Sequence, residues 1–230
     1  QLWCTTSLRG MAGGNLTVEV LSEGVHSGDA SGIVPSSFRI LRELLARIED
    51  ASTGKILIED MHVEIPADRM VQVERMADAL GDEVFSKFPF LPGMSPMGTD
   101  RVELVLNRTW RPALSITGAD GLPPLASAGN VLRPFTALKL SLRLPPTLDG
   151  KRGGELLQDA LLKDPPYGAR ISLHLEKAST GWNAPTMAPW LENAIEQSSQ
   201  DFFGRSAMYM GEGGTIPFMG MLGEKYPDAQ

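Results

Sequence analysis

The 230-residue chain is 42% hydrophobic and 21% charged, with a mean hydropathy of −0.08, the composition of an ordinary globular protein of one large or two small domains. Its net charge of −7 and lack of a basic run argue against a nucleic-acid surface, since phosphate binding needs clustered lysines and arginines. A single cysteine excludes an internal disulfide, and with three histidines it leaves no Cys/His zinc motif. No apolar stretch is long enough to predict a transmembrane helix.

The first part of the chain predicts a strand, a loop and a helix. Apolar and polar residues alternate over 15–22, which is typical of a half-buried strand. A loop rich in glycine, serine and aspartate follows at 24–32. Pro35 and the two serines after it then open a helix. The expected buried face of this helix consists of Phe38, Leu41, Leu45 and Ile48.

The next stretch is less regular. Short strands are predicted at 55–58 and 62–65, followed by an amphipathic helix at about 67–86. The apolar stripe of that helix consists of Met70, Val73, Met76, Ala77 and Leu80. A loop rich in proline, glycine and methionine follows at 89–98, and a strand is predicted at 102–107.

The second half of the chain contains the clearest strand signal, a strict alternation over 136–144. Another strand is predicted at 113–117, and a loop at 118–129 separates the two. A helix at about 152–163 and a further alternating strand at 170–176 follow.

Without an insertion at about 50–108, these elements run in the order β-α-β-β-α-β, which is the split βαβ or ferredoxin-like unit. We therefore expect an α+β fold with a four-stranded antiparallel sheet and both helices on one face. In the strand at 136–144 the leucines would face the helices, and Lys139, Ser141 and Arg143 would point the other way. Arg143 is thereby expected on the open face of the sheet.

The character of the chain changes after residue 178. A linker-like stretch at 182–189 leads into a helix at about 189–203. A short apolar strand at 207–210 then meets a glycine loop at 211–215 and another helix. A strand, a glycine loop and a helix in this order are typical of an α/β layer, so we place a domain boundary near residue 178.

The first candidate for chemistry is His26, in the glycine-flanked loop between the first strand and the first helix. A histidine in such a loop stays accessible and can adopt tight geometries. As a hydrogen-bond donor it could polarise a carbonyl or stabilise an oxyanion. The alternative is a loop histidine that bonds only to nearby backbone.

Two further candidates suit a carboxylate. Backbone N–H groups of the loop at 211–215 could bind an anion, and because no lysine follows the glycines, this is not a phosphate-binding P-loop. The alternative is a tight turn in which Thr215 caps the next helix. Arg143 could hold a carboxylate in a bidentate fork, and the alternative is that it lies on a solvated sheet face or forms a surface ion pair. His62 and His174 are interpreted as structural residues.

Three segments together resemble the carnosinase-type zinc peptidases. They are 16–28 with its Val-His-Ser-Gly, 129–145 with its Gly-Asn-Val-Leu and Arg-Leu-Pro, and Gly-Glu-Gly-Gly-Thr-Ile-Pro at 211–217. They follow the order typical of the family, and the resemblance covers nearly the whole chain. The wider family includes dipeptidases, carboxypeptidase G2, acetylornithine deacetylase and succinyl-diaminopimelate desuccinylase. The insertion at about 50–108 resembles the enlarged lid of the carnosinase branch.

The resemblance implies a catalytic α/β domain that holds two zinc ions, or manganese or cobalt, and that is interrupted by a dimerising lid. Residues 1–14 would end the first catalytic half, residues 15–178 would form the lid, and residues 179–230 would return into the catalytic domain. The metal ligands and general-base glutamate of the family would lie outside this chain, so no metal ligand and no bound cofactor are expected within it. The implied whole protein is a cytoplasmic, homodimeric metallopeptidase, and this piece alone would be inactive.

The same resemblance implies a role for each candidate residue. His26 would reach the active site of the partner subunit and stabilise the tetrahedral oxyanion. Arg143 would grip the free carboxylate of a dipeptide or N-acyl amino acid substrate, and Asn130 would add a polar contact from the lid. The residues that would hold the substrate from the catalytic domain are Gly213, Gly214 and Thr215.

Two differences from the family stand in the last segment. Carnosinases have Arg-Glu-Gly-Gly-Ser, whereas here Gly211 replaces the arginine and Thr215 the serine, which keeps the hydroxyl but argues against a carnosine-like substrate. Two other functions stay open: an N-acyl amino acid deacylase of the same family, and a stand-alone ferredoxin-like module for dimerisation or small-molecule binding. The stand-alone module predicts no exposed apolar surface around 179–230.

Overall fold

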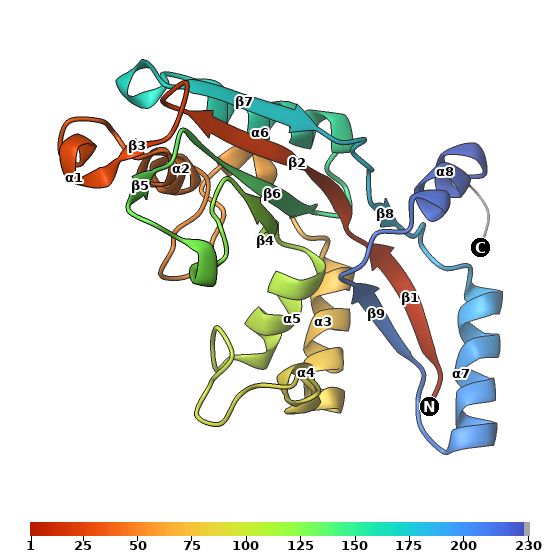
Figure 1. Ribbon diagram of the computed structural model, residues 1–230. Helices are drawn as coiled ribbons and strands as arrows, with labels where there is room; N and C mark the ends of the chain where they lie inside the picture. The colour runs from red at the N-terminus through yellow and green to blue at the C-terminus, as the bar shows by residue number, and fades with distance from the viewer. Residues whose placement is uncertain (228–230) are drawn as a thin grey trace.

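The computed structural model describes residues 1–227, which form two main β-sheets and a small two-stranded one, with helices packed against them (Figure 1). The strands are β1 (Trp3–Leu8), β2 (Gly10–Glu19), β3 (Val25–His26), β4 (Ala113–Asp120), β5 (Val131–Leu132), β6 (Phe135–Leu144), β7 (Arg170–Leu175), β8 (Trp182–Asn183) and β9 (Met208–Glu212). The α-helices are α1 (Ser27–Ala30), α2 (Ser37–Leu45), α3 (Ala67–Leu80), α4 (Glu83–Ser86), α5 (Arg101–Thr109), α6 (Gly150–Leu162), α7 (Pro189–Phe203) and α8 (Pro217–Lys225). Within this described part, no helix has the length and apolar character needed to cross a membrane.

The larger sheet has the strand order β4-β6-β2-β7, and every neighbouring pair is antiparallel. Leu16 of β2 lies opposite both Leu138 of β6 and Leu173 of β7, so apolar side chains of adjacent strands gather on one face. The four leucines of β6 at 138, 140, 142 and 144 are all buried. This confirms the alternation predicted at 136–144 and the mixed α+β class.

Helices α2 and α6 cover this apolar face, and their buried residues join the sheet leucines in one hydrophobic cluster. Helix α2 begins after Ser36, whose side chain accepts a hydrogen bond from a backbone N–H of the first turn. Ile40, Leu41 and Leu44 of this helix face the sheet and are completely buried. The predicted face was wrong at Phe38, which is 42% exposed, because the helix turns these three residues inward instead.

The smaller sheet has the order β8-β1-β9, in which β1 pairs antiparallel with β8 and parallel with β9. Helices α3 and α5 lie on one side of it and α7 on the other (Figure 1). Arg69 of α3 ties its helix to the edge of this sheet, donating to Asn183 Oδ1 at 2.9 Å and to the Ala184 carbonyl at 2.8 Å. Both α3 and α5 come from the stretch expected as an insertion.

The two sheets are joined where two passages of the chain cross. Only one residue separates β1 from β2, and the returning chain after β7 runs alongside. Met11 and Ser179 exchange two backbone hydrogen bonds, of 2.8 and 2.9 Å. A Cβ added at Gly10 would lie 2.8 Å from the Ser179 carbonyl oxygen, and one at Gly181 would lie 2.4 Å from that of Leu8. The crossing therefore requires glycine in both passages.

The strand predicted at 102–107 is wrong, because Arg101–Thr109 forms helix α5. The side chain of Asp100 caps this helix, accepting hydrogen bonds from two backbone N–H groups of the first turn at 2.8 and 3.3 Å. Val105 and Leu106 are buried, and they follow Val102 at the i+3 and i+4 spacing of a helix face that packs against α3 and α4. The cap and this packing outweigh the strand propensity of the valines.

Other predicted elements differ mainly in extent. The helix predicted at 67–86 divides into α3 and α4 at Gly81, whose φ of 55° favours glycine. The short strands predicted at 55–58 and 62–65 are not formed, and the first is represented only by an isolated bridge at Ile56.

The remaining predicted strands and helices are present with shifted ends. β2 begins at Gly10 and ends at Glu19, while β4 extends to Asp120. β9 continues into the predicted glycine loop as far as Glu212. The domain limits at residues 14 and 178 stay a prediction.

The core of the larger sheet gives a direct test of this architecture. Replacing Leu140 with alanine should lower the free energy of unfolding by about 3 kcal/mol, because a fully buried leucine leaves a cavity. The matched control is Ser141→Ala on the opposite face of β6, which should change it by less than about 0.5 kcal/mol. Urea denaturation measures both, and equal effects would contradict the assigned faces of the sheet.

Candidate functional site

Arg143 and Thr215 meet at the junction of the two sheets. Arg143 lies on the face of β6 opposite the leucines, as predicted, and its Nη1 donates to the Thr215 hydroxyl at 2.9 Å. Thr215 follows β9, so this hydrogen bond joins the larger sheet to the smaller one. Within residues 1–227 Arg143 forms no ion pair, which was one of the alternatives expected for it.

Arg9, between β1 and β2, is a buried member of the same junction. Its Nε donates to the Gly213 carbonyl at 3.1 Å, and its Nη1 donates to the carbonyls of Asn107 and Arg111 at 3.2 and 3.4 Å. Burial, and then the guanidinium charges of Arg143 and Arg108, lower the pKa of Arg9 to about 10. Arg9 is not among the site residues predicted from the sequence. An arginine flanked by glycine between two strands is the only local signal for it.

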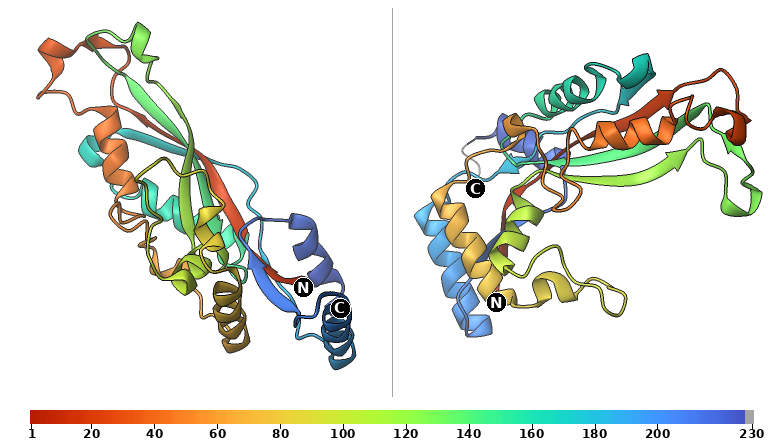
Figure 2. Two further views of the ribbon diagram at one scale, coloured as in Figure 1. Left: turned by 90° about the horizontal axis from the view of Figure 1, so that it is seen from below. Right: turned by 90° about the vertical axis from the view of Figure 1, so that its left-hand side faces the viewer.

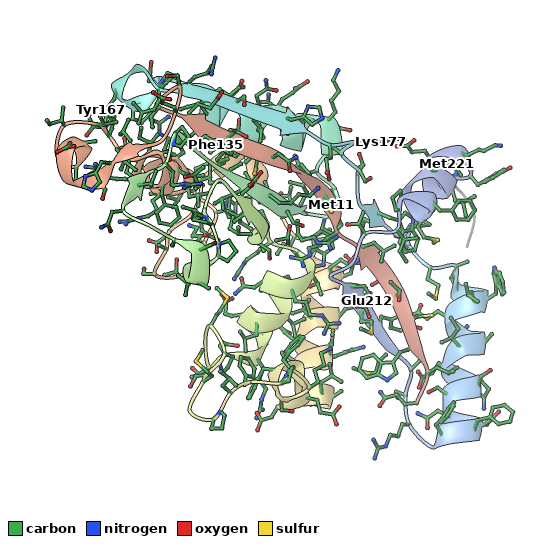
Figure 3. All side chains as sticks on the ribbon, in the orientation of Figure 1. Met11, Phe135, Tyr167, Lys177, Glu212 and Met221 are labelled. Carbon is green, nitrogen blue, oxygen red and sulfur yellow. The ribbon has the colours of Figure 1, made fainter. Side chains whose placement is uncertain are left out.

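Arg108, on the last turn of α5, also faces the glycine loop. Its Nη2 lies 3.0 Å from Glu212 Oε2, forming an ion pair in which both side chains are partly buried. Its Nη1 is buried and has no hydrogen-bond partner within residues 1–227. Side chains are drawn in Figure 3, where Glu212 and Met11 mark this junction and Phe135 and Tyr167 lie toward the opposite end of the larger sheet.

The glycine loop is packed tightly on its α5 side. A Cβ at Gly211 would lie 2.6 Å from Ser7 Oγ, so no arginine side chain fits there without rearrangement. A Cβ at Gly213 would lie 2.8 Å from the Arg108 carbonyl oxygen, whereas a Cβ at Gly214 would meet nothing within 4 Å. Thr215 does not cap α8, whose N-cap is Ile216, so its hydroxyl is available to Arg143.

His26 and Asn130 lie together at the other end of the larger sheet. His26 ends β3, which pairs with β5, and the Asn130 carbonyl accepts a hydrogen bond from the Ser27 N–H at 2.9 Å. The His26 Nδ1 accepts from the Gly28 N–H at 3.2 Å and lies 3.9 Å from Asp29 Oδ2. The imidazole remains 63% exposed, so the local backbone contact predicted as the alternative coexists with an accessible ring.

The predicted site residues thus fall into two groups. One end of β6 brings Arg143 to Gly213, Gly214 and Thr215, and the other end carries His26 and Asn130 (Figures 1 and 2). Since β6 extends about 3.3 Å per residue, the length from Phe135 to Arg143 is about 26 Å. A single small substrate cannot span that distance within one chain.

The described part of the chain does not offer a metal site. Within residues 1–227, no three histidine, cysteine, aspartate or glutamate side chains are grouped so that they could hold a metal ion. His62 bonds to the Ile56 carbonyl at 2.7 Å, and His174 lies exposed on β7. Cys4 is a half-buried residue of β1, beside a cavity of about 360 Å³. The donor set therefore does not fit a bound zinc ion here.

Known proteins resemble this chain over almost its whole length. Residues 6–168 match the family model of the peptidase dimerisation domain. The chain is 25% identical over 229 residues to a cysteinylglycine-S-conjugate dipeptidase of Corynebacterium striatum, covering 98% of this chain and 48% of that protein. It is 28% identical over 222 residues to the Cys-Gly metallodipeptidase DUG1 of Saccharomyces cerevisiae, covering 93% of this chain and 44% of that protein.

A solved structure has the same fold. Human carnosine dipeptidase 1 superposes with a TM-score of 0.72 at 21% identity, over 97% of this chain and 49% of that one. The chain spans about half the length of the curated relatives it matches.

The packing of the glycine loop predicts opposite outcomes for two neighbouring substitutions. Gly213→Ala should destabilise the fold by about 1–3 kcal/mol, because the new methyl group would collide with the Arg108 carbonyl. Gly214→Ala is the matched control and should be tolerated, since nothing lies near its Cβ position. Thermal unfolding of both variants measures the difference, and equal stabilities would contradict the described loop.

Proposed function

The chain belongs to the peptidase dimerisation domain family, and from this membership we propose that it is the lid and flanking part of a dipeptidase-like metallohydrolase. The whole protein would cleave a peptide or amide bond in substrates that carry a free carboxylate. The observation that carries this proposal is the hydrogen bond between Arg143 and Thr215, which joins two predicted substrate-binding residues from separate sheets.

We assign the larger unit to the ferredoxin-like class. Its elements β2, α2, β4, β6, α6 and β7 follow the β-α-β-β-α-β order, and the sheet order β4-β6-β2-β7 is that expected of a split βαβ unit. The smaller sheet, with a parallel pair and helices on both sides, suits a part of an α/β catalytic domain.

The charge at the junction suits a substrate carboxylate. Arg143 has no carboxylate within 4.0 Å in the described part of the chain, and one of its nitrogens already aligns with the Thr215 hydroxyl. A guanidinium and a hydroxyl placed side by side can both donate to the same carboxylate. Fixing the end of the substrate in this way would orient its scissile bond.

His26 would act in the partner subunit. It lies at the end of the larger sheet far from Arg143, so the two can serve one substrate only if they come from different copies of the chain. His26 lies on an arm formed by β3, α1, β5 and the loops next to them. This arm also exposes large apolar side chains, which suits contact with a second copy. These side chains are Ile33, Leu125 and Val131.

The part of the chain after residue 178 exposes a large apolar surface on α7 and α8. We infer that another part of the whole protein packs against this surface. Helix α7 exposes Trp190 and Phe202, and α8 exposes Phe218 and Met221, each by half or more. Strand β1 pairs with β8 only at Ser7 and Leu8. Within residues 1–227, the first half of β1 therefore has no neighbouring strand on the β8 side. An exposed apolar surface and an open sheet edge argue against a stand-alone module and favour a larger catalytic domain.

The metal ions of the proposed hydrolase, two zinc or alternatively manganese or cobalt, would be held by residues outside this chain. Such ions lower the pKa of a bound water and polarise the scissile carbonyl. Residues of this chain would contribute the carboxylate grip from Arg143 and Thr215, a polar contact from Asn130 and an oxyanion donor from His26.

Mixed dimers test the proposed contribution of the partner. In the whole protein, His26→Ala and Arg143→Ala should each lower kcat/KM by orders of magnitude. Dissociating and reassociating the two variants together should restore about a quarter of the wild-type activity, because half of the dimers are mixed and each mixed dimer has one intact site. His174→Ala, an exposed histidine of β7, is the control and should retain full activity. A mixture as inactive as its components would contradict catalysis across the dimer.

Metal analysis tests where the ligands lie. Residues 1–230 purified alone should carry less than about 0.1 metal ion per chain, because metal binding needs several ligands at one site. The whole protein should carry metal, and His26→Ala should leave its metal content unchanged. One or two zinc ions bound to residues 1–230 would contradict the proposed location of the ligands.

A further inference from the structure

Guanidinium groups from three separate parts of the chain hold the loop at 212–215. Arg108 of α5 pairs with the carboxylate of its first residue, at 3.0 Å. Arg9, which precedes β2, donates to the carbonyl of its second residue, at 3.1 Å. Arg143 of β6 donates to the hydroxyl of its fourth residue, at 2.9 Å. Elements that lie far apart in the sequence therefore converge on four consecutive residues.

These arginines differ in how many of their side-chain N–H groups are free to bind a ligand. The guanidinium of Arg9 is buried, and its Nε and Nη1 are committed to three carbonyls. Nη2 of Arg108 is committed to Glu212, and its Nη1 is shielded from solvent. Arg143 is only half-buried and forms a single side-chain hydrogen bond within residues 1–227. Of the group, Arg143 alone is placed to receive a ligand.

We propose that Arg9 and Arg108 are positioning residues, which hold the 212–215 loop so that Thr215 and Arg143 together receive one carboxylate. This inference rests on the proposed function for the identity of the ligand, but the loop-holding role does not. The charge of Arg9, which has no carboxylate partner within residues 1–227, adds positive potential where the carboxylate would bind. Burial lowers the pKa of Arg9 most, and the nearby charges of Arg143 and Arg108 lower it further.

The geometry explains why these positions need arginine. A guanidinium presents a planar set of donors that can bond to several carbonyls at once, whereas a lysine ammonium cannot match that arrangement. Arg9 joins Gly213 to the carbonyls at the end of α5, so the loop and the helix keep a fixed separation. The close approach of Gly213 to the Arg108 carbonyl adds a second constraint on the same side.

A double-mutant cycle in the whole protein tests the role of Arg108. The variants are Arg108→Gln, Glu212→Gln and the double variant, with Arg9→Lys as a separate change that keeps the charge but loses the fork. Hydrogen–deuterium exchange of the 209–217 peptide, without substrate, reports on the loop. The KM and kcat for a dipeptide and for its C-terminally amidated form report on carboxylate binding.

We expect each single variant to speed exchange of the loop by about tenfold, since a hydrogen bond to a charged group is lost. In the double variant the loop should exchange no faster than in the faster of Arg108→Gln and Glu212→Gln, because these two residues act through one contact. KM for the dipeptide should rise about tenfold in each, with kcat changed much less and the amidated substrate unaffected. The control is Arg101→Gln on the same helix, whose exposed pair with Asp82 lies away from the loop, and it should change none of these.

Unchanged loop exchange in both Arg108→Gln and Arg9→Lys overturns the inference, as does faster exchange with no effect on KM in an active protein. If Arg9→Lys fails to fold, the double-mutant cycle of Arg108→Gln and Glu212→Gln still tests whether these side chains hold the loop. If the whole protein cleaves no peptide or N-acyl amino acid, the proposed function fails, while the exchange measurements still test whether the arginines hold the loop.

Discussion

The position of the candidate site depends on the close crossing of two backbones between the sheets. With glycine at positions 10 and 181, no side chain separates the two passages, and Met11 and Ser179 bond directly. Because Met11 lies opposite Arg143 in the antiparallel register, the crossing also sets the end of β6. The meeting of Arg143 with Thr215, a residue of the other unit, follows from this arrangement.

The crossing also concentrates positive charge that the described residues do not neutralise. Arg108 has a carboxylate partner in Glu212, but neither Arg9 nor Arg143 has one within 4.0 Å in residues 1–227. Backbone carbonyls satisfy the donors of Arg9 without cancelling its charge. Burying the Arg9 guanidinium without a counter-ion costs desolvation free energy. This buried charge therefore lowers the free energy of unfolding. Such a cost is typical of a site shaped for a ligand.

Local pattern predicted the larger sheet well. The alternation over 136–144 identified the buried face of β6 and placed Arg143 on the other face, because strand periodicity is a local property. The same reasoning failed at 102–107, where the valines suggested a strand and the cap from Asp100 with packing against α3 produced a helix. The sequence also contains a helix signal here, because the capping residue Asp100 is followed by apolar residues at helical spacing.

The sequence predicts which residues are candidates for the site better than it predicts how they are arranged. His26 and Arg143 are candidates from their local sequence, and the resemblance to a family implies their roles, yet no periodicity indicates that they lie at opposite ends of one sheet. Arg9 was not identified at all, because its partners are backbone carbonyls from residues 107, 111 and 213, and backbone carbonyls leave no signal in a sequence. The packing of α3 and α5 on the smaller sheet likewise depends on contacts between distant segments.

The crossing at Gly10 and Gly181 also makes the larger sheet a lever. Strand β2 starts at the crossing and runs ten residues toward the arm of His26, a length of about 33 Å. A rotation of about 5° at the crossing would therefore swing the far end of the strand by about 3 Å, which is the width of a hydrogen bond. Because no side chain adds bulk at the crossing, a slight rotation there would be enough to make or break a contact at the opposite end of the larger sheet.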